Sequence, residues 1–131
     1  MAPLKSYREL EVWKLSMELA VKAYELSERF KPQDRYGLAS QFTRSASSIA
    51  ANIAEGYGRM SRPDYIRFLT IARGSLTEFE THLILAVRIG RFEREETREI
   101  WELSQIVSRY LRKLILALKR KEKANVRRVV E

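Results

Sequence analysis

Apolar residues recur at intervals of three and four along four long stretches of the chain, the pattern typical of helices that bury one face. The first predicted helix begins near Ser6 and Glu9, which have the spacing of a capping box, and continues to about Phe30. It carries two adjacent apolar rows, so we expect it to contact more than one neighbour. Residues 31–34 form a break that contains a proline, and the second predicted helix runs from there to Tyr57.

The third and fourth predicted helices each carry one apolar seam with alternating steps of three and four, the spacing of helices that pack at shallow angles. Ser61 is a suitable cap for the third helix, Pro63 fits its first turn, and Gly90 is a suitable left-handed end. The fourth helix begins among glutamates in residues 93–99 and ends among Lys and Arg, and both biases favour the helix dipole. Its expected core seam consists of Ile100, Leu103, Val107, Tyr110, Leu114 and Ala117.

Short connections make consecutive helices antiparallel, so the sequence predicts an all-α, up-down-up-down four-helix bundle. A chain of 131 residues fits a single domain of this kind. We place the bundle in residues 1–121 and a basic C-terminal extension in residues 122–131, which we expect to be frayed because they lack a strong apolar seam. Since no apolar run is long enough to span a bilayer, we expect no membrane partner and take a cytoplasmic location as the default.

Residues 44–59 are unusual for a helix because they consist mostly of small residues, with polar side chains at helical spacing. We expect this polar stripe to form, with two charged residues of the next helix, a buried network that sets helix register or a subunit interface. A contact with a ligand or with nucleic acid is the alternative. Gly74 and Ser75 are expected to face the alanines of residues 50–54, because small residues allow helices to approach closely. The residues assigned to the network are Arg44, Ser48, Asn52, Glu55, Arg73 and Glu78.

The formal charge of +8 is concentrated at the C-terminal end, where nine Lys or Arg against two Glu from Gln105 onward give +7. A patch of this kind attracts phosphate groups or acidic protein surfaces. The simpler alternative is a solvated helix end whose cations complement the helix dipole. The residues that we assign to nucleic-acid binding are Arg59, Arg62, Arg112, Lys113, Lys119, Arg120, Lys121, Lys123, Arg127 and Arg128.

Few residues are suited to catalysis or to metal binding. The chain has no Cys and a single His, His82, so thiolate chemistry is excluded and a zinc site is disfavoured, whereas an all-carboxylate metal site stays open. The serines of residues 45–48 lack a recognisable base, and the Gly-Tyr-Gly run at 56–58 lacks the strand and the lysine of a phosphate loop. We therefore expect no enzyme activity, no catalytic residues, no cofactor and no metal.

Four segments of the chain carry a family resemblance: LEVW at residues 10–13, RYGLASQ at 35–41, SIAANIAEGYGR at 48–59 and FLTIARGSLTEFETHL at 68–83. They resemble the four-helix bundle proteins associated with 23S rRNA intervening sequences, over about Tyr7 to Leu118. The resemblance implies a homopentamer around a central channel, with no known catalytic activity. One departure is Ala50, where many relatives have proline, and it should make the helix more regular.

The chain is also similar, more distantly, to the accessory variability determinants of diversity-generating retroelements. These share the pentameric bundle and act with a reverse transcriptase and nucleic acid. Our main hypothesis is a non-enzymatic, homo-oligomeric bundle, expected to be pentameric, that binds RNA or another nucleic acid through repeated basic surfaces. The alternative is an accessory subunit of a retroelement reverse transcriptase that binds the enzyme and its template RNA.

Overall fold

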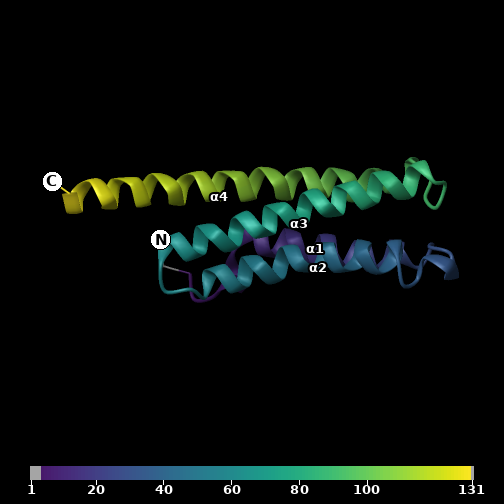
Figure 1. Ribbon diagram of the computed structural model, residues 1–131, viewed down its shortest axis with the longest axis horizontal. Helices are drawn as coiled ribbons and strands as arrows, with labels where there is room; N and C mark the ends of the chain where they lie inside the picture. Colours follow the sequence, from purple (N-terminus) through teal and green to yellow (C-terminus); the bar gives the residue numbers. More distant parts are fainter. Residues whose placement is uncertain (1–3, 131) are drawn as a thin grey trace.

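The computed structural model describes residues 4–130, which form helices and connecting turns and contain no strand. The four long helices are α1 (Glu11–Ser27), α2 (Leu38–Tyr57), α3 (Arg62–Arg88) and α4 (Arg98–Val130). They lie side by side, and the connections between them alternate between the two ends of the bundle (Figure 1). Short 3-10 turns precede α1, α2 and α4, at Tyr7–Glu9, Pro32–Asp34 and Glu95–Thr97. The expected all-α architecture with four helices is therefore confirmed.

Some predicted helix ends are confirmed and others are wrong. The Ser61 hydroxyl accepts a hydrogen bond from the Asp64 backbone N–H at the start of α3, and Gly90 has a φ of 78° just after its end. Ser6 caps the 3-10 turn before α1 instead of α1 itself. Likewise, the proline break is a separate 3-10 turn, so α2 begins at Leu38 and not near Pro32. At the other end of the chain, α4 continues to Val130, so the expectation of a frayed extension is wrong for residues 122–130. Glu131 lies outside the described residues.

The core lies between the helices and is built from the predicted apolar faces. Phe42 of α2 and Phe79 of α3 are fully buried, and their ring centroids are 4.9 Å apart. In α4 the predicted seam holds through Val107 and then shifts. Leu111 and Ile115 are buried there, whereas Tyr110 is 41% exposed and Ala117 faces solvent. An α-helix has 3.6 residues per turn and drifts relative to a strict seven-residue repeat, which explains the shift.

The most extensive helix contact joins α2 to α3, and small residues line it. The hydroxyls of Ser48 and Ser75 lie 2.9 Å apart, and the Asn52 amide donates to both the backbone oxygen and the hydroxyl of Ser48. Gly56 brings the backbones together further along, because a Cβ there would lie 2.8 Å from the Cβ of Phe68.

Gly74 does not take part in this contact, contrary to expectation. It is exposed, and a Cβ at this position would meet no atom within 4 Å. The buried positions of this stretch of α3 are Ala72, Ser75 and Leu76, so Gly74 lies on the opposite side of the helix. The predicted pairing of Gly74 with the alanines of α2 is therefore wrong, although Ser75 does face α2.

Ion pairs tie the chain together at the end of the bundle that holds the α3–α4 connection. Arg91 donates from Nε to Asp34 at 2.6 Å, and this hydrogen bond lowers the pKa of the Asp34 carboxyl. Lys22 of α1 pairs with Glu99 of α4, also at 2.6 Å.

No helix within residues 4–130 combines the length and the apolar character that a membrane span requires.

Gly56 in the last turn of α2 and Gly74 in the middle of α3 should respond in opposite ways to a methyl group. Gly56→Ala should lower the free energy of unfolding by about 1–3 kcal/mol, because the new Cβ overlaps Phe68 in a packed contact. Gly74→Ala should raise it by about 0.5–1 kcal/mol, because alanine favours an exposed helix and nothing obstructs its side chain. Chemical denaturation of both variants beside the parent chain measures the difference. Unchanged stability of Gly56→Ala would contradict the close α2–α3 contact.

Candidate nucleic-acid interface

The last turns of α4 extend past the rest of the molecule. Figure 1 shows α4 continuing beyond the ends of the other three helices. We call residues 119–130 the overhang; at 1.5 Å per residue these 12 residues are about 18 Å long. All of them are exposed except Glu122, which is half-buried. The overhang is thus a helix that contacts the bundle on one side only.

Basic residues cover the solvent side of this helix. From Arg109 to Arg128, α4 carries nine exposed Lys or Arg residues and one carboxylate, Glu122. Several of the cations recur at steps of three, four or seven, which places them on one face of the helix over about 27 Å. The members of this basic face are Arg109, Arg112, Lys113, Arg120, Lys123 and Arg127.

The nearby carboxylates are already paired with arginines of α3 and of the turn between α2 and α3. Glu55 pairs with Arg59 at 2.5 Å. Asp64 of α3 pairs with Arg67 at 3.6 Å. Glu122 of the overhang itself pairs with Arg62 at 3.4 Å. Within residues 4–130, none of the nine cations between Arg109 and Arg128 takes part in an ion pair. The overhang therefore carries positive charge that the described chain does not neutralise, and such charge attracts anions.

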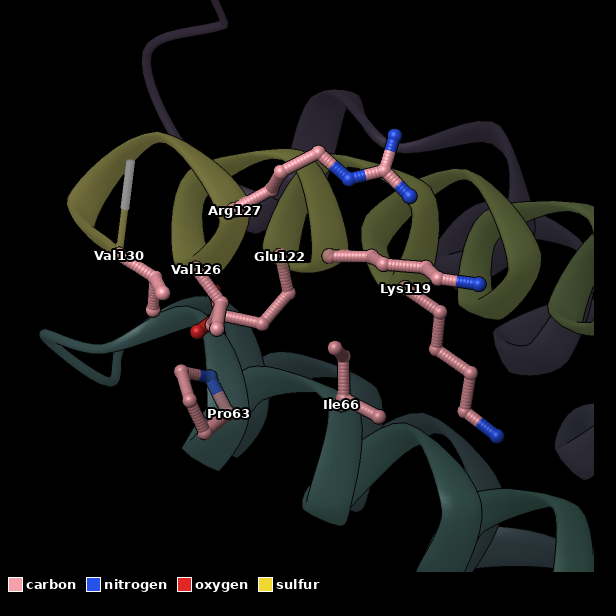
Figure 2. A pocket seen from close by; sticks show the side chains of 8 residues that line it. Pro63, Ile66, Lys119, Glu122, Val126, Arg127 and Val130 are labelled. Atoms are coloured by element: carbon pink, nitrogen blue, oxygen red, sulfur yellow. The ribbon is translucent and has the colours of Figure 1, made fainter.

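A groove of about 700 Å³ separates the overhang from the first turns of α3. Val126, Val130 and Glu122 point from α4 toward Pro63 and Ile66 of α3 (Figure 2). The charged end of Arg127 reaches away from this floor, whereas Lys119 extends from α4 toward α3 beside Ile66, so cations border the apolar surface (Figure 2). Lys123 also lines the groove.

The structure brings together eight of the ten residues assigned to nucleic-acid binding, all on the exposed surface of α4. The other two lie in or beside the α2–α3 turn and have partners. Arg62 pairs with Glu122 next to the groove, and Arg59 pairs with Glu55 while its guanidinium lies 4.6 Å from the centroid of the Phe68 ring.

Sequence reasoning missed Arg109 and the apolar floor of the groove. Arg109 precedes Arg112 and Lys113 by one turn, so helical spacing alone would have placed it on the basic face. The apolar floor could not be predicted from the sequence, because Ile66 and Val126 are 60 positions apart and no pattern in the chain pairs them.

The predicted polar network exists only in part. Ser48 and Asn52 hydrogen bond to each other and, through Ser48, to Ser75. The charged members stay out of this contact: Arg44 and Arg73 are exposed, while Glu55 pairs with Arg59 and Glu78 with His82 on the surface. Burying a charge costs free energy, and on the helix surface these charged groups are solvated or paired. The prediction of a buried charged network is therefore wrong for contacts within one chain. The role of these residues in a subunit contact stays a prediction.

The remaining hydroxyl and titratable groups make local contacts. Ser45 and Ser47 donate to the backbone oxygens of Phe42 and Arg44, one turn earlier in α2. His82 lies 3.4 Å from Glu78 on α3. Residues 4–130 contain no group of three metal-ligating side chains.

Comparisons with known proteins place the chain in a family. The sequence matches the model of the 23S rRNA-intervening sequence protein over residues 8–113. A solved protein of unknown function from the S23 ribosomal protein family of Bacteroides thetaiotaomicron VPI-5482 is similar, with 32% identity and a TM-score of 0.74, over 79% of this chain and 97% of that chain. No curated protein matches. The overhang lies beyond the matched residues, which cover the bundle up to Lys113. The chain belongs to the family of the 23S rRNA-intervening sequence protein.

Proposed function

We propose that this protein is a non-enzymatic, homo-oligomeric helical bundle that binds RNA through the basic face and overhang of α4. The observation that carries the proposal is the unneutralised charge there: nine exposed cations on one helix, while the carboxylates nearby are paired with other arginines. Phosphate groups would take the place of the missing counter-charges. Contacts of this kind supply affinity without reading a base sequence.

The simpler explanation, cations that only complement the helix dipole, does not account for their extent. The dipole acts within the last turn of a helix. Apart from Arg98 at its start, the cations of α4 lie between Arg109 and Arg128, which is about five turns at 3.6 residues per turn. Like charges at this density repel one another, so a polyanion would stabilise the helix that carries them.

Self-association is the second part of the proposal. We infer that the helices pack as an antiparallel up-down-up-down bundle and that five copies form a ring. An apolar groove of about 530 Å³ between α1 and α2 supports a contact with another subunit. Met17, Val21 and Tyr24 are 41–54% exposed beside it, and a contiguous apolar patch is typical of an interaction surface. A ring would repeat the overhang and raise its avidity for one RNA molecule.

Binding to RNA should weaken steeply with salt, because each phosphate that the protein neutralises releases a counterion. We expect the variant with Lys119, Arg120, Lys121, Arg127 and Arg128 changed to Gln to bind far more weakly at low salt. On single-stranded RNA, the slope of log K against log salt should become shallower by about 0.7 for each phosphate that the variant no longer neutralises. Fluorescence anisotropy with labelled RNA over a salt series measures both quantities.

A charge-matched control separates this site from a general effect of net charge. Its five cations are exposed, lie outside the overhang and have no ion-pair partner among residues 4–130. They are Lys14, Lys31, Arg35, Arg88 and Arg94, also changed to Gln. The control should bind RNA nearly as well as the parent chain. Equal reductions in affinity for the two variants, or no binding by the parent at low salt, would contradict the proposed mechanism.

The mass of the particle in solution tests the assembly. Five copies of a 15.4 kDa chain make a particle of 77 kDa. Light scattering coupled to size-exclusion chromatography should give this mass at micromolar concentration. A particle of one chain would rule out the ring and the avidity that it provides.

A further inference from the structure

Cations alone do not explain the groove between α3 and the overhang, because its floor is apolar. Starting from the proposed RNA-binding function, we propose that this groove receives an unpaired base and that the protein binds single-stranded RNA in preference to duplex. The occupant is thus a nucleotide whose base packs against Ile66 and Val126 while its phosphates contact the cations that border the groove. The groove belongs to the same site, and its apolar floor determines the class of RNA that binds there.

The size and lining of the groove fit such an occupant. Its volume of about 700 Å³ lies in the range of small-molecule sites, roughly 300–1,000 Å³. Pro63 and Ile66 from α3 and Val126 and Val130 from α4 supply apolar surface on both sides (Figure 2). A base is flat and largely apolar on its faces, and proteins that bind single strands stack it on aromatic side chains beside a positively charged path. Here aliphatic side chains of α3 and α4 would supply the apolar surface.

The arrangement of charge orients the nucleotide. Arg127 carries its charge outward from the floor, and the charge of Lys119 lies beside Ile66 at one end of the groove, so phosphates are attracted to the border of the groove (Figure 2). Glu122 lies on the floor, where its carboxylate already pairs with Arg62 and repels an incoming phosphate. The nucleotide therefore favours an orientation in which its sugar-phosphate backbone faces outward and its base enters the groove.

A duplex cannot use the groove in this way. Its bases are stacked and paired, so it presents phosphates and sugars to a protein that does not open it. A duplex would contact the cations of α4 and leave the apolar floor exposed to water. The apolar contact should then add a contribution to single-strand binding that does not depend on salt, since burial of apolar surface involves no counterion release. It adds to the electrostatic contributions, whose salt slopes differ between single strands and duplex.

The test compares one labelled, unstructured RNA oligonucleotide with the same strand annealed to its complement, by fluorescence anisotropy over a salt series. The full chain should bind the single strand about tenfold more tightly than the duplex at the same salt, a preference at the low end of the range found for one base stacked on an aromatic side chain, as suits an aliphatic floor. The double variant Ile66→Ala and Val126→Ala should lose most of this preference and keep its salt slope. Alanine preserves helix propensity, and circular dichroism confirms that α3 and α4 remain folded.

Val129→Ala is the matched control, because Val129 lies on the same turns of α4, is 79% exposed and does not line the groove. It should bind both RNAs like the parent. Equal affinity of the parent for single strand and duplex would overturn the inference, and so would an unchanged preference in the double variant. Either result leaves RNA binding by the cations intact. Failure of the parent to bind either RNA at low salt would instead overturn the proposed function.

Discussion

The close contact between α2 and α3 is the constraint on which the arrangement of the other elements depends. Gly56 admits Phe68 and Tyr65 to within contact distance of the α2 backbone, and a hydrogen bond between Ser48 and Ser75 joins the same two helices further along. This contact fixes the first turns of α3. Ile66 follows Tyr65 directly, and Arg62 begins the helix and pairs with Glu122 of α4. The floor of the groove is therefore set by small residues that contact no ligand themselves.

The two ends of the bundle use their charges differently. At the end with the α3–α4 connection, opposite charges pair between elements, as in Asp34 with Arg91 and Lys22 with Glu99. At the other end, α4 carries cations with no such partners among the described residues. Six of the twelve residues of the overhang are Lys or Arg, which are good helix formers, and cations suit the negative end of a helix. These preferences explain a helix that persists where only one side of it is packed.

Helical periodicity predicted the four helices, and cap chemistry predicted the ends at Ser61 and Gly90. Both signals are local, which is why they can be read from the chain. The predictions that failed depend on which neighbour a residue meets. Gly74 is small like Gly56, but the direction of its missing side chain is set by the rotation of α3 about its axis. The missing apolar seam in residues 122–130 predicts fraying, yet α4 continues there with six Lys and Arg in residues 119–130 that favour helix and with an ion pair between Glu122 and Arg62.

The sequence predicted the candidate site only as a concentration of basic residues, whereas the structure shows the surface that they form together with α3. Counting Lys and Arg located the basic end of α4, because this segment folds as a single exposed helix and its cations therefore remain close together on the surface. Counting could not show that the carboxylates of Glu55, Asp64 and Glu122 are paired elsewhere, nor that α3 supplies half of an apolar groove. Both follow from contacts between residues far apart in the sequence.

Mapping of RNA crosslinks tests the central claim, RNA binding by the overhang, most directly. The full-length protein would be irradiated in complex with unstructured RNA, digested after glutamate to spare the Lys-rich and Arg-rich segment, and sequenced by mass spectrometry. Crosslinks should concentrate in residues 119–130 and in the first turn of α3, which face each other across the groove. Crosslinks confined to α1, or to the end that holds residues 91–99, would contradict a site on the overhang.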